Sequence, residues 1–163
     1  MRAHRHRRWH LDEMFVKING AKHYLWRAVD HEGEVLESYV TKTRDKAAAL
    51  IFLGKALRRH GPTEAIVTDH LASYGAALKV FGATGKHNAG RWLNNRAENS
   101  HQPFRRRERA MLRFRRMRSL QKFASLHGSI HNHFNQERHL TSRALYKDRR
   151  DAALIAWRGL GAA

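Results

Sequence analysis

The first quarter of the chain alternates apolar or β-branched residues with polar ones, which predicts short strands. The apolar stretches WHLDEMFVKING (9–20), HYLWRAV (23–29) and EVLESYVT (34–41) are separated by turn residues. Asn19-Gly20 is a strong hairpin signal, and Asp30 to Gly33 supply the second turn. Three consecutive strands joined by tight turns form an antiparallel meander.

A helical period replaces the alternation after residue 42. Thr43 is a candidate cap with Asp45 in the first turn, and Gly61-Pro62 ends the helix. The apolar run 65–68 is then predicted to be a buried strand that ends at Asp69. A helix over 71–81 follows, and the glycines between 82 and 90 indicate an irregular stretch.

The last third of the chain is helical and basic. Asn94 or Asn95 is a candidate cap for a helix that holds Glu98, and Pro103 is expected to kink or interrupt that helix. A narrow apolar seam, interpreted as core packing, comprises Leu120, Phe123, His127, Ile130 and Phe134. The candidate packing residues of a final helix near 142–158 are Leu145, Ala152, Ile155 and Ala156.

This order of elements predicts an α/β fold of the ribonuclease-H-like class. A three-stranded antiparallel meander would be joined by parallel strands and flanked by helices. With 163 residues the chain is long enough for one domain and short for two. We expect a basic flexible arm at 1–8 and one core at 9–160, with a helical basic part from about residue 96.

Charge separates this chain from an average globular protein. Lys and Arg number 32 against 14 Asp and Glu, which gives a formal net charge of +18. Such a charge opposes compaction unless a polyanion neutralises it, and nucleic acid is the usual polyanion. Charge alone fits a generic basic, ribosomal-type protein as well as a DNA enzyme. The absence of cysteine excludes disulfides and cysteine-based zinc sites. No apolar run or signal-like segment indicates a membrane protein, so we expect an intracellular one.

Acidic residues are scarce, and three of them stand at informative positions. Asp12 lies in the first strand, Asp69 ends the fourth strand, and Glu98 lies in the first turn of a helix. Ligand sites in open α/β sheets gather at the carboxyl ends of strands. Phosphodiester chemistry uses two divalent ions about 3.5–4 Å apart, and carboxylates hold Mg²⁺. In this hypothesis Asp69 bridges both ions, while Asp12 and Glu98 each complete one coordination shell.

Each of these carboxylates also has a simpler interpretation. Glu13 is adjacent to Asp12 and is an alternative functional residue, although strand alternation sends the two side chains to opposite faces. Asp69 is also typical of a turn or a cap. Glu98 is also typical of a first-turn acid that the helix dipole favours.

Three strings resemble the DDE transposases of bacterial insertion sequences, in particular the IS-six family. They are WHLDEMFVKINGAKHYLWRAVD, IVTDHLASYGAA and NNRAENSHQPFRRRERAMLRF. The resemblance implies a catalytic, metal-binding triad of Asp12, Asp69 and Glu98, with Mg²⁺ or Mn²⁺ as cofactor, two ions being expected. It also implies that Arg105, two helical turns after Glu98, is the family's basic residue.

The same resemblance implies a function and its partners. Element ends would be cut on one strand, and the freed 3′-hydroxyl would attack target DNA. DNA, a second copy of the chain and a bacterial cytoplasm or nucleoid are therefore expected, with no membrane and no small-molecule substrate. Relatives carry a helix-turn-helix before the core, whereas only MRAHRHRR precedes Trp9. The alternative is thus a truncated, non-catalytic DNA-binding remnant, and a basic RNA-associated protein is a further rival.

Arginines crowd the segment that follows Glu98. Arginine suits bidentate contacts with phosphate, so we expect this segment to grip DNA. Phe104 and Phe114 lie among the arginines, where anchoring to the core is favoured over stacking on bases. The predicted DNA-binding residues are Asn95, His101, Arg105, Arg106, Arg107, Arg109 and Arg113.

Overall fold

A five-stranded mixed sheet forms the centre of the computed structural model, which describes residues 8–90, 93–111, 113–134 and 142–161. The strand order is β3-β2-β1-β4-β5. β1, β2 and β3 pair antiparallel, whereas β4 runs parallel to β1 and β5 parallel to β4. The strands are β1 (Arg8–Ile18), β2 (Ala21–Asp30), β3 (Val35–Thr41), β4 (Ala65–Thr68) and β5 (His87–Ala89). The predicted meander and buried fourth strand are confirmed.

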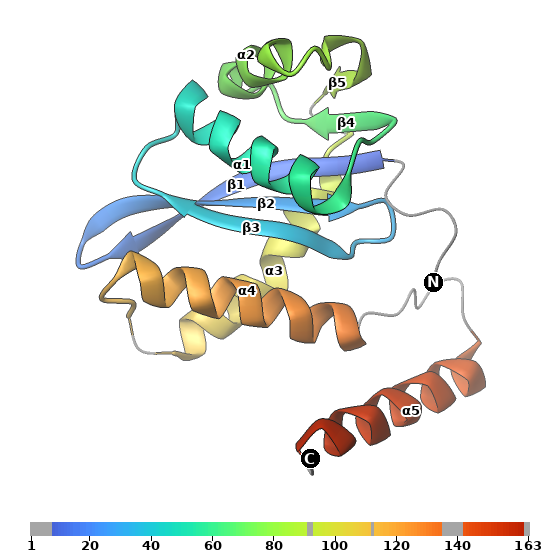
Figure 1. The fold of residues 1–163 in the computed structure, drawn as a ribbon. Helices are drawn as coiled ribbons and strands as arrows, with labels where there is room; N and C mark the ends of the chain where they lie inside the picture. Colours follow the sequence, from blue (N-terminus) through green and yellow to red (C-terminus); the bar gives the residue numbers. More distant parts are fainter. Residues whose placement is uncertain (1–7, 91–92, 112, 135–141, 162–163) are drawn as a thin grey trace.

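Helices cover both faces of the sheet (Figure 1). α1 and α2 pack on one face around Trp9, Leu11 and Trp26, and α3 and α4 pack on the other around Val16 and Leu25. Alternation along β1 therefore feeds both cores from a single strand. The helices are α1 (Lys46–His60), α2 (Ala72–Val80), the short 3-10 helix η1 (Thr84–Lys86), α3 (Asn95–Ala110), α4 (Met117–Phe134) and α5 (Arg143–Gly161).

The outer edge of β3 is closed by two side-chain amides from α4. Val40 N donates to Oε1 of Gln121 at 2.8 Å, and Nε2 of Gln121 donates to Ser38 O at 2.7 Å. Asn132 bonds both the N–H and the carbonyl of Val35 in the same way, at 2.7 Å each. The two amides stand 11 positions apart, close to three helical turns, so they face the same strand. They occupy backbone groups that an exposed edge would offer to another chain.

Two predicted local details are wrong, and the interruption of the helix that was one of two effects expected at Pro103 does not occur. The cap of α1 is Asp45, whose carboxylate accepts from Ala48 N at 2.9 Å, so Thr43 is not the cap. α3 runs without interruption through Pro103. Pro103 has no N–H to donate to the carbonyl of Asn99. At the next residue, Nη1 of the buried Arg27 donates to the carbonyl of Ser100 and so supports the helix backbone there. The stretch 82–90 contains η1 and β5, which carry no periodic signal because they are short and largely exposed.

α5 lies apart from the rest of the protein and meets it near the end of α4 (Figure 1). His133 contacts Ala153 O at 2.8 Å, and its ring lies 5.8 Å from that of Trp157. None of the residues of α5 is buried, so the predicted packing of Leu145, Ala152, Ile155 and Ala156 is wrong. Of the predicted seam of α4, Leu120 is buried in the core and the other four residues are half-buried, whereas the remaining buried positions of the helix, Ala124 and Gly128, were not predicted.

The expected arm at 1–8 falls almost wholly on residues outside the described ranges, and Arg8 is the first residue of β1. Within the ranges that the structure describes, no helix combines the length and the apolar character needed to cross a membrane.

Candidate active site

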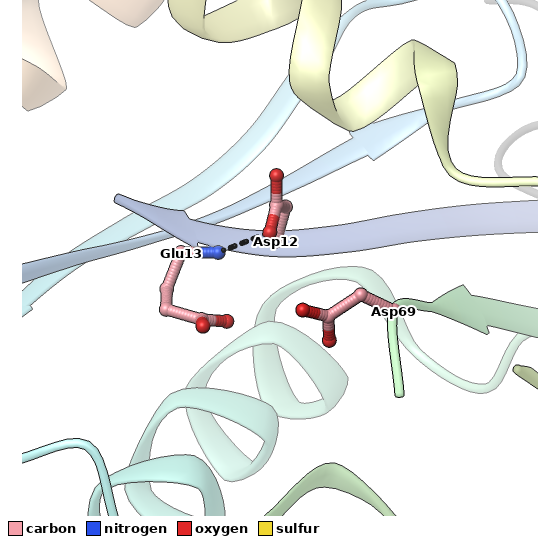
Figure 2. Close-up of side chains that lie close together, drawn as sticks. All are labelled: Asp12, Glu13 and Asp69. Carbon is pink, nitrogen blue, oxygen red and sulfur yellow. Dashed lines mark hydrogen bonds between the residues drawn. The ribbon is translucent and has the colours of Figure 1, made fainter. Parts of the chain in front are cut away.

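The sheet brings Asp12 and Asp69 together. β1 and β4 pair in parallel with His10 opposite Val67, and continuing that register by two residues sets Asp12 level with Asp69. The chain leaves the sheet after Thr68, and Oδ1 of Asp69 accepts from the backbone N–H of Leu71 at 3.0 Å, which holds the Asp69 side chain at the carboxyl end of β4. Carboxylate oxygens of Asp12, Glu13 and Asp69 lie within 4.8 Å of one another (Figure 2). These three residues are called the carboxylate cluster below.

Asp12 and Glu13 leave β1 on opposite sides, as strand alternation predicts (Figure 2). Glu13 nevertheless reaches the cluster, because its carboxylate and that of Asp69 lie on the same side of the strand (Figure 2). Oδ1 of Asp12 accepts from the backbone N–H of Glu13 at 2.9 Å. That N–H points to the edge of β1 that β4, four residues long, does not cover. The alternative that Glu13 takes part in the site is therefore consistent with the geometry.

The surroundings of the cluster raise the proton affinity of Asp12 and of Glu13. Burial, followed by the charge of Glu13, raises the pKa of Asp12 from 3.8 to about 7, and Asp69 and Glu98 add to the effect. Burial and the charge of Asp69 also raise the pKa of Glu13, while Arg44 opposes that shift. The cluster thus favours a proton or a cation over three free negative charges.

A cation already stands beside the cluster. Nε of Arg44 donates to Oε1 of Glu13 at 2.5 Å, and its Nη2 also contacts that oxygen. The same Nη2 lies 3.9 Å from Oδ2 of Asp69. Tyr74 of α2 is fully buried nearby, and burial together with the Glu13 charge raises the pKa of its hydroxyl well above 10. Tyr74 therefore stays protonated and adds no further negative charge.

α3 lies over the Asp12 side of the cluster. Nδ1 of His101 is 3.6 Å from Oδ2 of Asp12, and both side chains are 13% exposed. Burial, then the charges of Arg27 and Arg105, lowers the pKa of His101 to about 3, so its ring is neutral. Glu98, three positions earlier, is exposed and lies outside the 4.8 Å group, although its charge contributes to the raised pKa of Asp12.

Asn94, the residue before α3, and Arg105 of α3 bind the uncovered edge of β1. Nδ2 of Asn94 donates to Leu11 O at 2.7 Å, and Nη2 of Arg105 donates to Phe15 O at 2.5 Å. Asn94 is the residue before α3, yet its side chain makes no capping bond. Arg105 also pairs with Glu108 at 2.7 Å. Its guanidinium is therefore engaged with the strand edge rather than with the carboxylate cluster.

Comparison with known proteins shows the family of the chain. A family model described as a DDE domain, of the IS240 transposase type, matches residues 6–137. The chain belongs to the DDE transposase family. The resemblance to insertion-sequence transposases seen in the sequence is thereby confirmed.

Curated relatives of this DDE domain are transposases of insertion sequences. The transposase for insertion sequence-like element IS431mec of Staphylococcus aureus is 33% identical over 99 residues, which cover 58% of this chain and 44% of the relative. The transposase for insertion sequence element IS257 in transposon Tn4003, also of Staphylococcus aureus, gives the same figures. The chain therefore spans less than half the length of these curated relatives in the region that it matches.

A solved retroviral structure shares the fold of this DDE domain. The intasome of simian T-cell lymphotropic virus, solved in complex with PP2A regulatory subunit B56 gamma, aligns with a TM-score of 0.50 and 20% identity. The alignment covers 58% of this chain and 36% of that one. At this identity the likeness concerns the fold alone, and it confirms the predicted ribonuclease-H-like α/β class.

The residues of this DDE domain fit a divalent metal ion. The cluster supplies only carboxylate oxygens, the ligands that Mg²⁺ and Mn²⁺ prefer. A second acidic group, Asp30, Glu32 and Glu34, has an evident structural role. Oδ1 of Asp30 accepts from the backbone N–H groups of Glu32 and Glu34 at 2.9 Å each, which holds the turn between β2 and β3.

The predicted DNA-binding residues remain a prediction, and their exposure differs. Phe104 and Phe114 are buried in the core beneath α3 and α4, so the anchoring interpretation is confirmed. His101 and Arg105 are half-buried at the contacts described above. The remaining predicted residues are exposed: Asn95, Arg106, Arg107, Arg109 and Arg113. Sequence reasoning missed Arg44, because a lone arginine in a loop gives no spacing signal.

Proposed function

We propose that this DDE domain cleaves and joins DNA strands to move an insertion sequence. The observation that carries the proposal is the meeting of Asp12 and Asp69 at one point of the sheet, in a chain that matches the DDE family. Asp12, Asp69 and Glu98 are the proposed catalytic carboxylates. The reaction would begin with single-strand cleavage at an element end and continue with attack of the freed 3′-hydroxyl on target DNA.

Asp12 and Asp69 would hold Mg²⁺ or Mn²⁺, and Glu98 would complete the metal ligands from α3. Two bound ions would activate the attacking oxygen and neutralise charge on both bridging oxygens of the phosphodiester. The chain's own residues prepare this site without metal. α3, the helix that carries Glu98, is fixed to β1 through Asn94 and Arg105, which holds His101 3.6 Å from Asp12. Because its ring is neutral, His101 lies beside Asp12 without competing with a metal ion for the negative charge of the carboxylate.

DNA is the proposed partner and substrate. The net charge of +18 and the exposed arginines of α3 favour a polyanion. Transposition brings two element ends together, so we also propose that the chain works as a homo-oligomer. A bacterial cytoplasmic location beside the nucleoid follows from the same proposal.

Strand transfer with a pre-cut DNA end in Mg²⁺ tests this function. The proposal predicts inverted repeats on either side of the gene, and these would supply the end sequence. Asp69→Asn keeps the size of the side chain and removes one metal-binding charge, so it should abolish strand transfer while DNA affinity stays within about twofold. Asp151→Asn, on the exposed surface of α5, is the matched control and should transfer strands normally. Undiminished transfer by Asp69→Asn would refute the mechanism.

The same measurements decide between the proposal and its two rivals. A non-catalytic DNA-binding protein would bind DNA in the native chain and show no strand transfer with any end. A basic RNA-associated protein would have no metal site that depends on carboxylates. For that rival, a titration with Mn²⁺ would give the same binding curve for the native chain and for Asp69→Asn. Binding is measured as the loss of the electron paramagnetic resonance signal of free Mn²⁺.

A further inference from the structure

Arg44 is fixed beside the carboxylate cluster from outside the sheet. It lies in the loop between β3 and α1, and its side chain is 42% exposed. Glu13, its anchor, has a side chain only 2% exposed. Two nitrogens of Arg44, Nε and Nη2, contact the same oxygen of Glu13, and Nη2 also approaches Asp69. Within the part of the chain that the structure describes, Nη1 of Arg44 has no partner.

This arrangement differs from that of an ordinary surface ion pair. A guanidinium held in one orientation by a buried carboxylate has lost most of its side-chain freedom before any ligand arrives. The unpaired nitrogen stands on an exposed group that is 3.9 Å from Asp69. Three clustered carboxylates repel a phosphate, so a fixed cation at their border would lower that repulsion. Guanidinium groups suit phosphate oxygens because several donors lie in one plane.

We propose that Arg44 binds a phosphodiester group of DNA at the carboxylate cluster and that Glu13 is the residue that positions it. The inference rests on the proposed function, because it takes DNA as the substrate. Arg44 thereby becomes a DNA-binding residue from the β3–α1 loop, on the side of β1 opposite α3. Glu13 acts through Arg44 and is a positioning residue.

DNA affinity measured by fluorescence anisotropy tests the proposal, with a generic duplex in EDTA and a series of salt concentrations. One lost phosphate contact makes the slope of log affinity against log salt shallower by about 0.9. Arg44→Gln should show that change together with roughly tenfold weaker binding at low salt, the usual worth of a charged hydrogen bond. Arg44→Lys keeps the charge, so it should retain the salt slope and recover part of the affinity.

Arg59 and Glu37 provide a matched control pair. They form an ion pair at 3.3 Å between α1 and β3, with 66% and 12% of their side chains exposed. Arg59→Gln removes the same charge from an anchored arginine away from the cluster, and should leave the slope unchanged. Glu13→Gln should weaken DNA binding only while Arg44 is present. Its effect should therefore vanish in the Arg44→Gln background, whereas Glu37→Gln should show no such coupling.

Several results would overturn the inference. Equal affinities and slopes for Arg44→Gln and Arg59→Gln would show that Arg44 is only a link between the loop and β1. Additive effects of Glu13→Gln and Arg44→Gln would remove the positioning role of Glu13. Circular dichroism and thermal melting of each variant separate these results from misfolding, and Arg44→Lys provides a variant that keeps the ion pair. Failure of the proposed function would instead appear as unchanged strand transfer by Asp69→Asn, whatever Arg44 does.

Discussion

The raised pKa of Asp12 has a consequence for stability that requires neither DNA nor metal. Its folded-state pKa of about 7 lies above the ordinary value of 3.8, so the ionised carboxylate opposes folding. The cost is absent below pH 4, grows as the pH rises, and is fully present above pH 7. Asp12→Asn removes the charge and keeps the oxygen that accepts from Glu13 N. The variant should therefore be more stable than the native protein at pH 8 without metal.

The magnitude follows from the same values. A difference of about 3 pH units at 1.36 kcal/mol each gives a ceiling of about 4 kcal/mol. The Asp12 side chain is 13% exposed, so water screens part of the charge and roughly half of the ceiling, about 2 kcal/mol, is expected. For a chain of this length that corresponds to a rise in Tm of about 4–8 °C. At pH 5 the gain should fall to roughly 40% of its value at pH 8, by the same linkage relation.

Differential scanning calorimetry in EDTA at pH 8 and pH 5 measures this difference. Asp151→Asn is the control, because Asp151 is exposed and its Tm should change by less than about 2 °C. Added Mg²⁺ should stabilise the native protein more than Asp12→Asn, since a ligand raises Tm only where it binds the folded state. A Tm gain that is equal at pH 5 and pH 8 would refute the electrostatic reasoning, and so would a loss of stability at pH 8.

Two further predictions concern α3 and α4. Gln121→Leu leaves Val40 N and Ser38 O without their partners, so urea unfolding should show a free energy of unfolding lower by about 1–3 kcal/mol. Ser129→Ala, on the exposed face of the same helix, is the control and should lower it by under about 0.5 kcal/mol. Equal losses for the two variants would mean that the edge of β3 needs no amide. Because burial lowers the pKa of His101 to about 3, below its ordinary 6.5, its neutral form contributes stability that is complete above pH 6.5 and is lost as the pH falls toward 3. Its ring signals in a nuclear magnetic resonance titration, assigned with His101→Gln, should not move between pH 8 and pH 5, and a midpoint near 6.5 would contradict the burial argument.

Local pattern was sufficient for most of the fold. The alternation in 9–41 gave the meander, and the apolar run before Asp69 gave the fourth strand, because both signals lie within a few residues of sequence. β5 was missed because a three-residue strand contains too little alternation to be recognised. Local rules also misplaced the cap of α1. They expected a kink or an interruption at Pro103, where α3 continues and Arg27 donates to the carbonyl of Ser100.

Some residues of the candidate site could be predicted from the sequence, and others could not. Asp12 and Asp69 could be chosen from the sequence, because acids are rare and these two stand at strand positions typical of ligand sites. The presence of Glu13 in the cluster could not be predicted. Strand alternation puts Asp12 and Glu13 on opposite sides of β1 and does not say on which side Asp69 lies. Helical spacing predicted a common face for Glu98 and Arg105. It could not predict that the guanidinium binds the carbonyl of Phe15.

The sequence by itself determined the longer strands and helices, the excess of positive charge and the family strings that carry the carboxylates. These properties depend on residue type and on short spacings, which a single chain displays directly. Only the tertiary structure decided the register in which β4 pairs with β1, which sets Asp12 level with Asp69. It alone placed Arg44 on Glu13 and left α5 without a buried face. Contacts between residues far apart along the chain depend on how complete faces pack, and no local pattern encodes that choice.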